Sequence, residues 1–324
     1  MRHSHVCIAA LAIIATSFDA SAATLVWSDE FEGSFGYPDQ SKWSYETGGD
    51  GWGNSELQYY TDRRDALANA FIWENKLIIK ARKESYEGMA YTSARLNSRE
   101  SWLYGRFVIR AKMPSGAGTW PAIWMLPTDN AYGTWPDSGE IDIMEHLGKD
   151  SGTIYTSLHT EAQNHMLGNS RSASFVVSDA TSAFHDYRID WTETGIWFYV
   201  DDELKYYTPN ESVEGSEDAS ASWPFDQPFH LLLNMAMGGW GGTVDESVLP
   251  QDFEIDYVRV YSLEGADGLA YRYDGVDVNG WTDNPVLGQI YVRLDPWIWS
   301  DRLKTWLYVP TPPDEIGGWT YVFN

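Results

Sequence analysis

The chain has 324 residues and a formal net charge of −25, from 47 acidic and 22 basic side chains. This charge disfavours nucleic acid and anionic membrane surfaces as partners, because both are themselves negatively charged. Seventeen tryptophans and twenty tyrosines are present; most should fill a core, but aromatic rings also stack on the flat C–H faces of sugars.

Residues 1–22 have the layout of a secretory signal peptide. Basic Arg2 precedes an apolar run from Val6 to Thr16 and a small-residue cleavage sequence that ends at Ala22. We therefore expect a secreted, extracellular protein. The apolar run is too short to cross a bilayer, and no later stretch is long enough. Because the only cysteine, Cys7, lies in this peptide, the mature chain would have no disulfide.

From residue 23 to 263 the chain is a series of short runs in which apolar and polar side chains alternate. In 105–112, for example, Phe107, Ile109 and Ala111 alternate with basic residues, and turn-forming residues separate the runs. A period of two is typical of strands with one face in a core. The pattern predicts an all-β domain, an antiparallel β-sandwich or jelly roll whose concave face could hold an extended polymer.

The stretch 138–146 carries three carboxyl groups separated by apolar residues. Read as a strand, it places Glu140 and Asp142 on one face, whereas Glu145, five residues beyond Glu140, would point to the other. One extra residue near 143–144, accommodated as a β-bulge, returns Glu145 to the first face. The sequence therefore predicts a bulged strand with all three carboxyl groups on one face.

This spacing suits a pair of catalytic carboxyl groups. The α-carbons of Glu140 and Glu145 would lie about 13 Å apart, and converging side chains would leave about 5 Å between the carboxyl groups, as in retaining glycosidases. Asp142 between them favours a raised pKa on a neighbour, which an acid catalyst needs. The alternative is a solvated acidic face of an edge strand, and the spacing does not assign the two roles.

The acidic stretch resembles the bulged active-site signature of family-16 glycoside hydrolases, in the form typical of laminarinases, agarases and carrageenases. Further blocks resemble the family in the same order: 26–31, 51–61, 91–95, 118–127, 135–136, 233–240 and 255–261. The resemblance implies a jelly roll over 23–263, with Glu140 as nucleophile, Glu145 as acid/base and Asp142 as their helper.

The resemblance also implies residues that contact the sugar chain. Aromatic rings would form a stacking wall and polar side chains would bond to hydroxyl groups: Asn54, Arg95, Trp120, Trp124, Trp135, His159, Asn234 and Trp240. For the tryptophans the alternative is core packing. Arg95 could instead neutralise the acidic cleft, His159 could be a structural histidine, and Asn234 could be a buried structural amide.

Glu30 and Asp256, near the two ends of the domain, resemble the carboxylates with which many family members bind one calcium ion. Oxygen ligands suit calcium, so we expect a structural ion on the convex face. Two carboxylates are few, and backbone ligands cannot be read from sequence. The resemblance implies no cofactor for the chemistry itself.

Residues 264–324 read as a linker followed by an aromatic-rich extension. A weak repeat at 290–292, 307–309 and 320–322 predicts short hairpins in a small β module. The module could bind carbohydrate, pack on the main domain or attach the protein to a surface. Alone it would be marginally stable.

Together these features predict a secreted, monomeric, retaining endo-hydrolase whose partner is a polysaccharide, with laminarin-like β-1,3-glucan as substrate. One alternative keeps the chemistry but acts on agarose, porphyran or mixed-linkage β-glucan. Another is a non-catalytic glucan-binding protein, which is disfavoured because such proteins typically lack one or both glutamates. A third is an adhesin that acts through the C-terminal module.

Overall fold

The computed structural model describes residues 23–212, 219–263, 281–284, 288–294, 297–300, 305–308 and 321–323. The predicted signal peptide, residues 1–22, lies outside these residues. The chain divides into two compact units, one formed by Thr24–Leu263 and the other by Met1–Ala23 with Glu264–Asn324. Among the described helices, none combines the length and the apolar character needed to cross a membrane.

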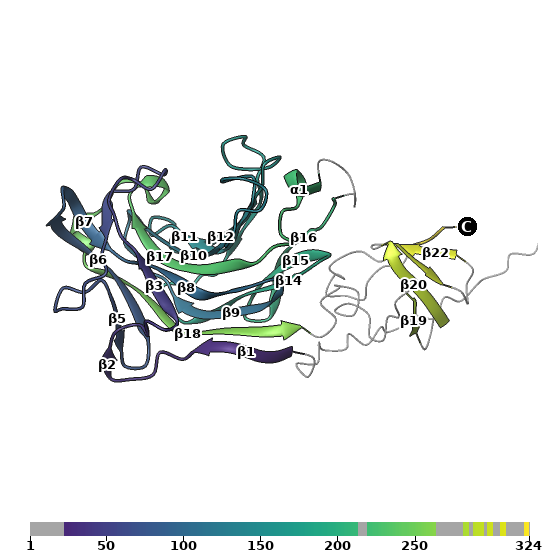
Figure 1. Cartoon of the computed structure of the whole chain (residues 1–324), viewed down its shortest axis with the longest axis horizontal. Helices are drawn as coiled ribbons and strands as arrows, with labels where there is room; N and C mark the ends of the chain where they lie inside the picture. Colours follow the sequence, from purple (N-terminus) through teal and green to yellow (C-terminus); the bar gives the residue numbers. More distant parts are fainter. Residues whose placement is uncertain are drawn as a thin grey trace, which may run out of the picture. The chain divides into compact units, whose positions relative to one another are not determined.

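The first unit is built from two β-sheets that face each other (Figure 1). The larger sheet has eleven strands. Its main path runs in the order β16 (Glu203–Pro209), β15 (Gly195–Val200), β14 (His185–Thr192), β9 (Gly105–Lys112), β18 (Gln251–Leu263), β6 (Leu77–Tyr86), β5 (Ala70–Trp73) and β2 (Phe35–Gly36). Off this path lie β1 (Ala23–Asp29), which pairs with β18, and β7 (Met89–Ser93), which joins β6 to β4 (Gln58–Tyr60).

The smaller sheet has seven strands and carries the acidic stretch on a strand near its middle. Its order is β13 (Arg171–Val176), β12 (Thr153–His159), β11 (Glu140–His146), β10 (Thr119–Pro127), β17 (Phe229–Met237), β8 (Arg95–Trp102) and β3 (Trp43–Glu46). Loops project beyond its outer face on both sides (Figure 1). The prediction of an all-β antiparallel sandwich is confirmed, with one parallel exception, the pair β4 and β7.

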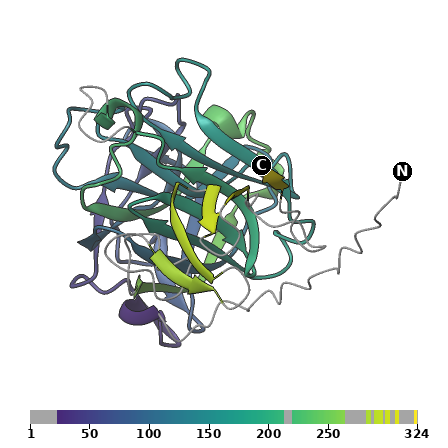
Figure 2. The same cartoon turned by 90° about the vertical axis from the view of Figure 1, so that its right-hand side faces the viewer.

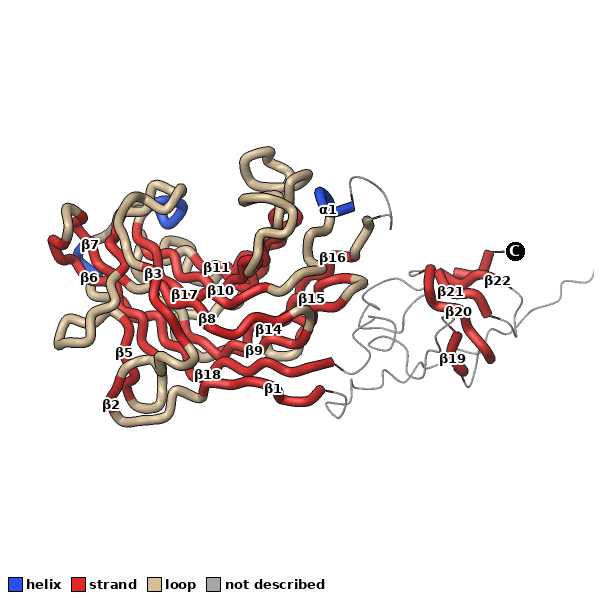
Figure 3. The backbone as a smooth tube through the Cα atoms, viewed as in Figure 1, coloured by secondary structure: helices blue, strands red, loops and turns tan. Residues whose placement is uncertain are grey.

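Among the described residues, helical structure is confined to short turns in the loops (Figures 2 and 3). These turns are α1 (Ala219–Ser222), η2 (Gly239–Gly241) and η3 (Glu246–Val248). Glycine allows the backbone to form the turn η2. Gly238 and Gly239 have φ angles of 75° and 53°, which favour a residue without a Cβ atom.

The core lies between the two sheets and explains why alternating sequences form these strands. On β9, Phe107 and Ile109 are completely buried, and they belong to the same apolar cluster as Ile123 and Met125 of β10. Each large apolar side chain buried in this way contributes about 1.5–3 kcal/mol. Among the residues whose burial is described, every member of this cluster lies between Phe31 and Val260, so the first unit has a core of its own.

Among the described residues after Leu263, five strands form a separate antiparallel sheet. They follow one another in chain order: β19 (Trp281–Asn284), β20 (Gly288–Leu294), β21 (Trp297–Ser300), β22 (Thr305–Tyr308) and β23 (Tyr321–Phe323). Neighbours in sequence are neighbours in this sheet, as expected for consecutive hairpins.

Candidate active site

The acidic strand β11 contains the expected irregularity. On β12, Glu140 faces His159, Asp142 faces Ser157 and Glu145 faces Tyr155. These partners on β12 are two residues apart, whereas Asp142 and Glu145 on β11 are three residues apart. The register against β10 shifts at the same place. One extra residue is therefore inserted after Asp142, and all three carboxyl groups lie on one face of the sheet.

The opposite side of β11 belongs to the core. Ile141 and Met144 are fully buried in the apolar cluster, and Ile143 is 4% exposed. These side chains anchor the strand against the larger sheet. The bulge thus lets apolar residues fill the core while the carboxyl groups stay on the outer face.

Two indole N–H groups donate to the two glutamates. Trp135 Nε1 lies 2.8 Å from an oxygen of Glu140, and Trp120 Nε1 lies 2.9 Å from an oxygen of Glu145. An indole N–H is a donor only, so each bond favours the ionised carboxylate. Glu145 is 8% exposed and the Glu140 side chain 18%, which leaves these bonds among the few that either glutamate can make.

Burial raises the pKa of all three carboxyl groups. The pKa of Glu140 rises to about 8, because lost hydration is reinforced by the neighbouring charge of Asp142. The pKa of Glu145 rises to about 7, where lost hydration outweighs the opposing bond from Trp120. The pKa of Asp142 is raised well above its usual range by burial and by Glu145. At neutral pH the trio therefore keeps at least one proton that it can donate.

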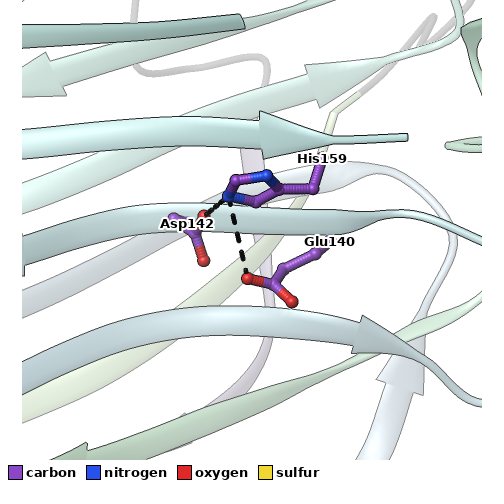
Figure 4. A group of neighbouring side chains, drawn as sticks. All are labelled: Glu140, Asp142 and His159. Atoms are coloured by element: carbon purple, nitrogen blue, oxygen red, sulfur yellow. Dashed lines mark ion pairs between the residues drawn. The ribbon is translucent and has the colours of Figure 1, made fainter. Parts of the chain in front are cut away.

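His159 lies beside the trio, with Nε2 3.1 Å from Asp142 Oδ2 and 4.0 Å from Glu140 Oε1. Figure 4 shows the ring reaching from the neighbouring strand toward both carboxyl groups. Its Nδ1 accepts a hydrogen bond from the backbone N–H of His165 at 3.3 Å. In the neutral ring the proton is therefore on Nε2, where it faces the carboxyl groups.

Glu140, Asp142 and His159 bring one potential metal-ligand atom each within 4.8 Å of one another. Two carboxylates and an imidazole are ligand types that transition metals accept. A metal on this site would need His159 Nε2 without its proton, whereas the bond at Nδ1 places the proton there. The arrangement is better suited to holding protons than to holding a cation.

Arg95 is tightly held on β8, which is separated from the acidic strand by β17 and β10. Its guanidinium lies 4.7 Å from the ring centroids of both Trp52 and Trp124 and pairs with the carboxylate of Glu46. The residue is 9% exposed. Arg95 therefore has a carboxylate partner of its own, and the predicted role of neutralising the acidic strand is not needed to explain its position.

Asn54 and Asn234 both take part in hydrogen bonds within the protein. Asn234 is 5% exposed, accepts from Trp124 Nε1 at 2.7 Å and donates to Tyr60 Oη at 3.0 Å. The exposed Asn54 donates to Glu56 at 3.3 Å. Asn234 thus holds the indole of Trp124, and its predicted bond to a sugar hydroxyl stays a prediction.

The loop after β17 brings Trp240 to the Glu145 side of the strand. The ring is 42% exposed and lies 5.8 Å from the ring of Trp120 and 4.8 Å from that of Tyr155. Lys149 Nζ donates to the Trp240 carbonyl at 2.9 Å and fixes the loop. The exposed ring therefore stands in an aromatic cluster next to Glu145.

Three residues of the site were missed in the sequence, namely Glu46, Trp52 and Tyr155. Trp52 lies within the 51–61 block that resembles the family, so its place beside Arg95 had a signal that could have been used. Glu46 and Tyr155 had none, because each is defined only by the strand that lies next to it: Glu46 faces Arg95, and Tyr155 faces Glu145.

Glu30 and Asp256 line one hollow of about 730 Å³ with Glu32, Gly33, Asn75, Tyr257 and Arg259. Both oxygens of Glu30 accept from Arg259, at 3.0 and 2.8 Å, and this pairing lowers the Glu30 pKa. Asp256 lies 3.5 Å from Arg110. Three carboxylates line the hollow, but Arg259 competes with an ion for Glu30. The calcium site therefore stays a prediction.

Comparison with known proteins places the first unit in a family. The sequence profile of glycosyl hydrolases family 16 matches residues 53–259. The beta-glucanase of Rhodothermus marinus is 54% identical over 244 residues, which cover 73% of this chain and 84% of that protein. The structure of the laminarinase from Rhodothermus marinus superposes with a TM-score of 0.71 at 53% identity, covering 74% of this chain and 98% of the other.

A more distant structure extends the likeness. The non-specific endo-β-1,3(4)-glucanase SCLam matches with a TM-score of 0.69 at 40% identity, over 75% of this chain and 92% of that one. The fold, the acidic strand and these matches together define a glycoside hydrolase. The chain belongs to family 16 of these enzymes, as its motifs indicated.

Proposed function

We propose that the protein is an endo-acting hydrolase of β-1,3-glucan that retains the configuration of the anomeric carbon. The observation that carries this proposal is the placement of Glu140 and Glu145 on one face of the bulged strand, each with its own indole donor. Relatives support the substrate, since glucan endo-1,3-beta-glucosidases of Niallia circulans and Cryptopygus antarcticus are 38% and 36% identical.

In the first step, a carboxylate oxygen of Glu140 attacks the anomeric carbon and forms an ester as the glycosidic bond breaks. Glu145 gives its proton to the departing oxygen. In the second step, Glu145 takes a proton from water, which attacks the same carbon and releases Glu140. The raised pKa of Glu145, about 7, suits a group that must first give and then take a proton. The pKa of Glu140 is also raised, to about 8, so the reactive form is the one in which the proton held by the pair is on Glu145, and the bond from Trp135 stabilises ionised Glu140 in that form.

The charges around the site favour a neutral polymer. Three carboxyl groups lie on the outer face of β11, and Arg95 on β8 is already paired with Glu46. A sulfated chain would meet repulsion from the three carboxyl groups. The keratan-sulfate endo-1,4-beta-galactosidase of Sphingobacterium multivorum, at 35% identity, shows that the family includes enzymes named for such substrates.

Mixed-linkage β-glucan is a second candidate substrate. SCLam is described as a non-specific endo-β-1,3(4)-glucanase, and the endo-1,3-1,4-beta-glycanase EglC of Rhizobium meliloti is 34% identical. A beta-1,3-glucan-binding protein of Penaeus monodon is 31% identical. Because both glutamates are present here, hydrolysis is favoured over binding alone.

The test is product analysis on laminarin, lichenan, agarose and carrageenan, with the anomer of the first product followed by NMR. We expect laminarin to be cleaved internally with the β-anomer formed first. Either Glu140→Gln or Glu145→Gln should lower turnover at least roughly 10²-fold, whereas Glu203→Gln, at an exposed carboxylate on β16, should not. A first product with inverted anomeric configuration, or near-normal turnover in Glu140→Gln or Glu145→Gln, would contradict the mechanism.

The same proposal includes secretion through cleavage after Ala22, action as a monomer and a structural calcium ion at Glu30 and Asp256. No cofactor takes part in the steps described. The exact cleavage site can be read from the N-terminal sequence of the secreted protein, and the bound calcium from elemental analysis.

A further inference from the structure

Glu56 is a buried carboxyl group outside the acidic strand, and the proposed chemistry does not use it. It is 6% exposed and lies just before β4. Three side-chain donors converge on it: Gln58 Nε2 at 2.5 Å, Tyr60 Oη at 2.9 Å and Asn54 Nδ2 at 3.3 Å. Burial raises its pKa, so the protein keeps it at a cost that its partners must offset.

The direction of these bonds follows from one group that can only donate. Trp124 Nε1–H donates to Asn234 Oδ1, so the Asn234 amide turns its Nδ2 toward Tyr60 Oη. Tyr60 accepts that bond and is free to donate its own proton to Glu56. The chain of bonds therefore runs from the Trp124 indole to Glu56, and its last member must accept.

A second chain ends at the same carboxyl group. The backbone N–H of Met237 donates to Gln58 Oε1 at 2.7 Å, which leaves Gln58 Nε2 to donate to Glu56. Tyr60 and Gln58 both donate to Oε2, and Asn54 donates to Oε1. An ionised carboxylate is acceptor-only, and it satisfies all three donors at once.

Glu56 is also tied to the loop that carries Trp240. Its backbone forms a bridge with Gly238, and Leu57 N–H donates to the Met237 carbonyl at 2.8 Å. The loop packs closely, since a Cβ on Gly239 would lie 2.7 Å from the Asn54 carbonyl oxygen. The segment from Glu56 to Tyr60 therefore contacts Asn54, the loop that carries Trp240 and, through Asn234, the Trp124 indole.

We infer that Glu56 is a positioning residue for two aromatic side chains predicted to bind the sugar chain, Trp124 and Trp240. It fixes them through Asn54, Tyr60 and Gln58. This inference rests on the proposed function, because these aromatic side chains are taken to bind glucan. Glu140 and Glu145 keep their own donors, Trp135 and Trp120. Loss of Glu56 should therefore weaken substrate binding while the bond-breaking step is preserved.

The experiment compares Glu56→Gln with wild type and with Asp29→Asn in the full chain. Glutamine has the same shape but puts an N–H₂ group against donors. We expect KM to rise at least tenfold, kcat to stay within about threefold, and the pH profile of kcat to be unchanged. Asp29 is a matched control, because it is 8% exposed and accepts from Trp43 Nε1 at 2.8 Å in a different part of the fold.

If Glu56→Gln does not fold, Tyr60→Phe is used in its place. This variant removes only the hydroxyl that links Asn234 to Glu56. It should raise KM less than Glu56→Gln, and the double variant should show less than the sum of both effects. Folding is checked for every variant by its Tm. A Glu56→Gln protein that folds with a normal KM, or equal KM changes in Asp29→Asn, would overturn the inference.

KM is measured on whichever polysaccharide of the panel the wild type cleaves. If the wild type cleaves none of them, the proposed function fails, and the inference is then tested by tryptophan-fluorescence titration with laminarin. In that case a tenfold weaker Kd in Glu56→Gln is expected, and an unchanged Kd overturns the inference on its own.

Discussion

Trp120 and Trp135 each hold a different glutamate of the acidic strand through an indole N–H. A donor of this kind stabilises the charged carboxylate and so opposes the effect of burial on the pKa. The pKa values of Glu140 and Glu145, about 8 and about 7, reflect burial, the neighbouring carboxyl charges and these opposing bonds. Individual hydrogen bonds should therefore be visible in the pH dependence of the reaction.

Trp120→Phe tests this balance. Removing the indole N–H removes a bond that lowers the Glu145 pKa, so the pKa should rise above about 7. Because Glu145 must be protonated to donate, its alkaline limb in kcat/KM should move to higher pH. The measurement is a pH–rate profile, with Trp240→Phe as the control, since that ring is exposed. A limb that stays in place or moves down would show that Trp120 does not tune Glu145.

At this scale the sequence was informative where function depends on local spacing and silent where it depends on distant partners. Glu140 and Glu145 were found because six consecutive residues decide which way their side chains point. The partner of Glu30 was not, because Arg259 is 229 residues away. Two carboxylates suggested calcium, and only the folded chain revealed that an arginine reaches one of them.

The bulge in β11 is the element on which the site depends. It adds one residue between Asp142 and Glu145 relative to both neighbouring strands. The presence of a bulge could be predicted, since a regular strand would have turned Glu145 into the core. The pairing of β11 with β10 and β12 could not, because strand neighbours are set by the packing of the whole sheet.

Deleting Ile143 tests the bulge. The deletion makes the ladder regular on both sides and leaves three carboxyl groups on the same face, since they would then alternate at positions two apart. We expect a folded enzyme with reduced but measurable hydrolysis, destabilised by about 2–4 kcal/mol through the loss of a buried side chain. Activity and Tm are the measurements.

The matched control inserts one alanine after Ile143. With the insertion, four residue steps separate Asp142 from Glu145, so a regular strand would return Glu145 to the same face but about 7 Å farther along it, and hydrolysis should be abolished. If the deletion variant folds but is as inactive as the insertion variant, the extra residue itself, rather than the face it selects, is needed for catalysis.

On the scale of the whole molecule, the two compact units differ in how much of them could be predicted. The first could be predicted as a jelly roll, because its alternating runs and its family motifs agree. In the second, a five-stranded sheet is described, and its role stays a prediction. No motif there indicates a ligand.

A chain that ends at Leu263 should keep the activity of the full protein on soluble laminarin, with kcat/KM within about twofold. The reason is that both sheets of the first unit and its entire apolar cluster lie within Thr24–Leu263. Retention on insoluble glucan, measured in parallel, shows whether residues 264–324 bind polysaccharide. Loss of soluble activity in the shortened chain would contradict the independence of the first unit.

The pairing of Arg95 within the protein bears on how salt affects substrate binding. Its guanidinium is matched by Glu46 and flanked by Trp52 and Trp124, so capture of substrate does not rely on long-range attraction. Dissolved ions screen the interaction between exposed charges more than about 8 Å apart at physiological ionic strength. An uncharged polymer has no such interaction with the protein for salt to screen. We therefore expect glucan capture to proceed equally well in fresh, brackish and marine water.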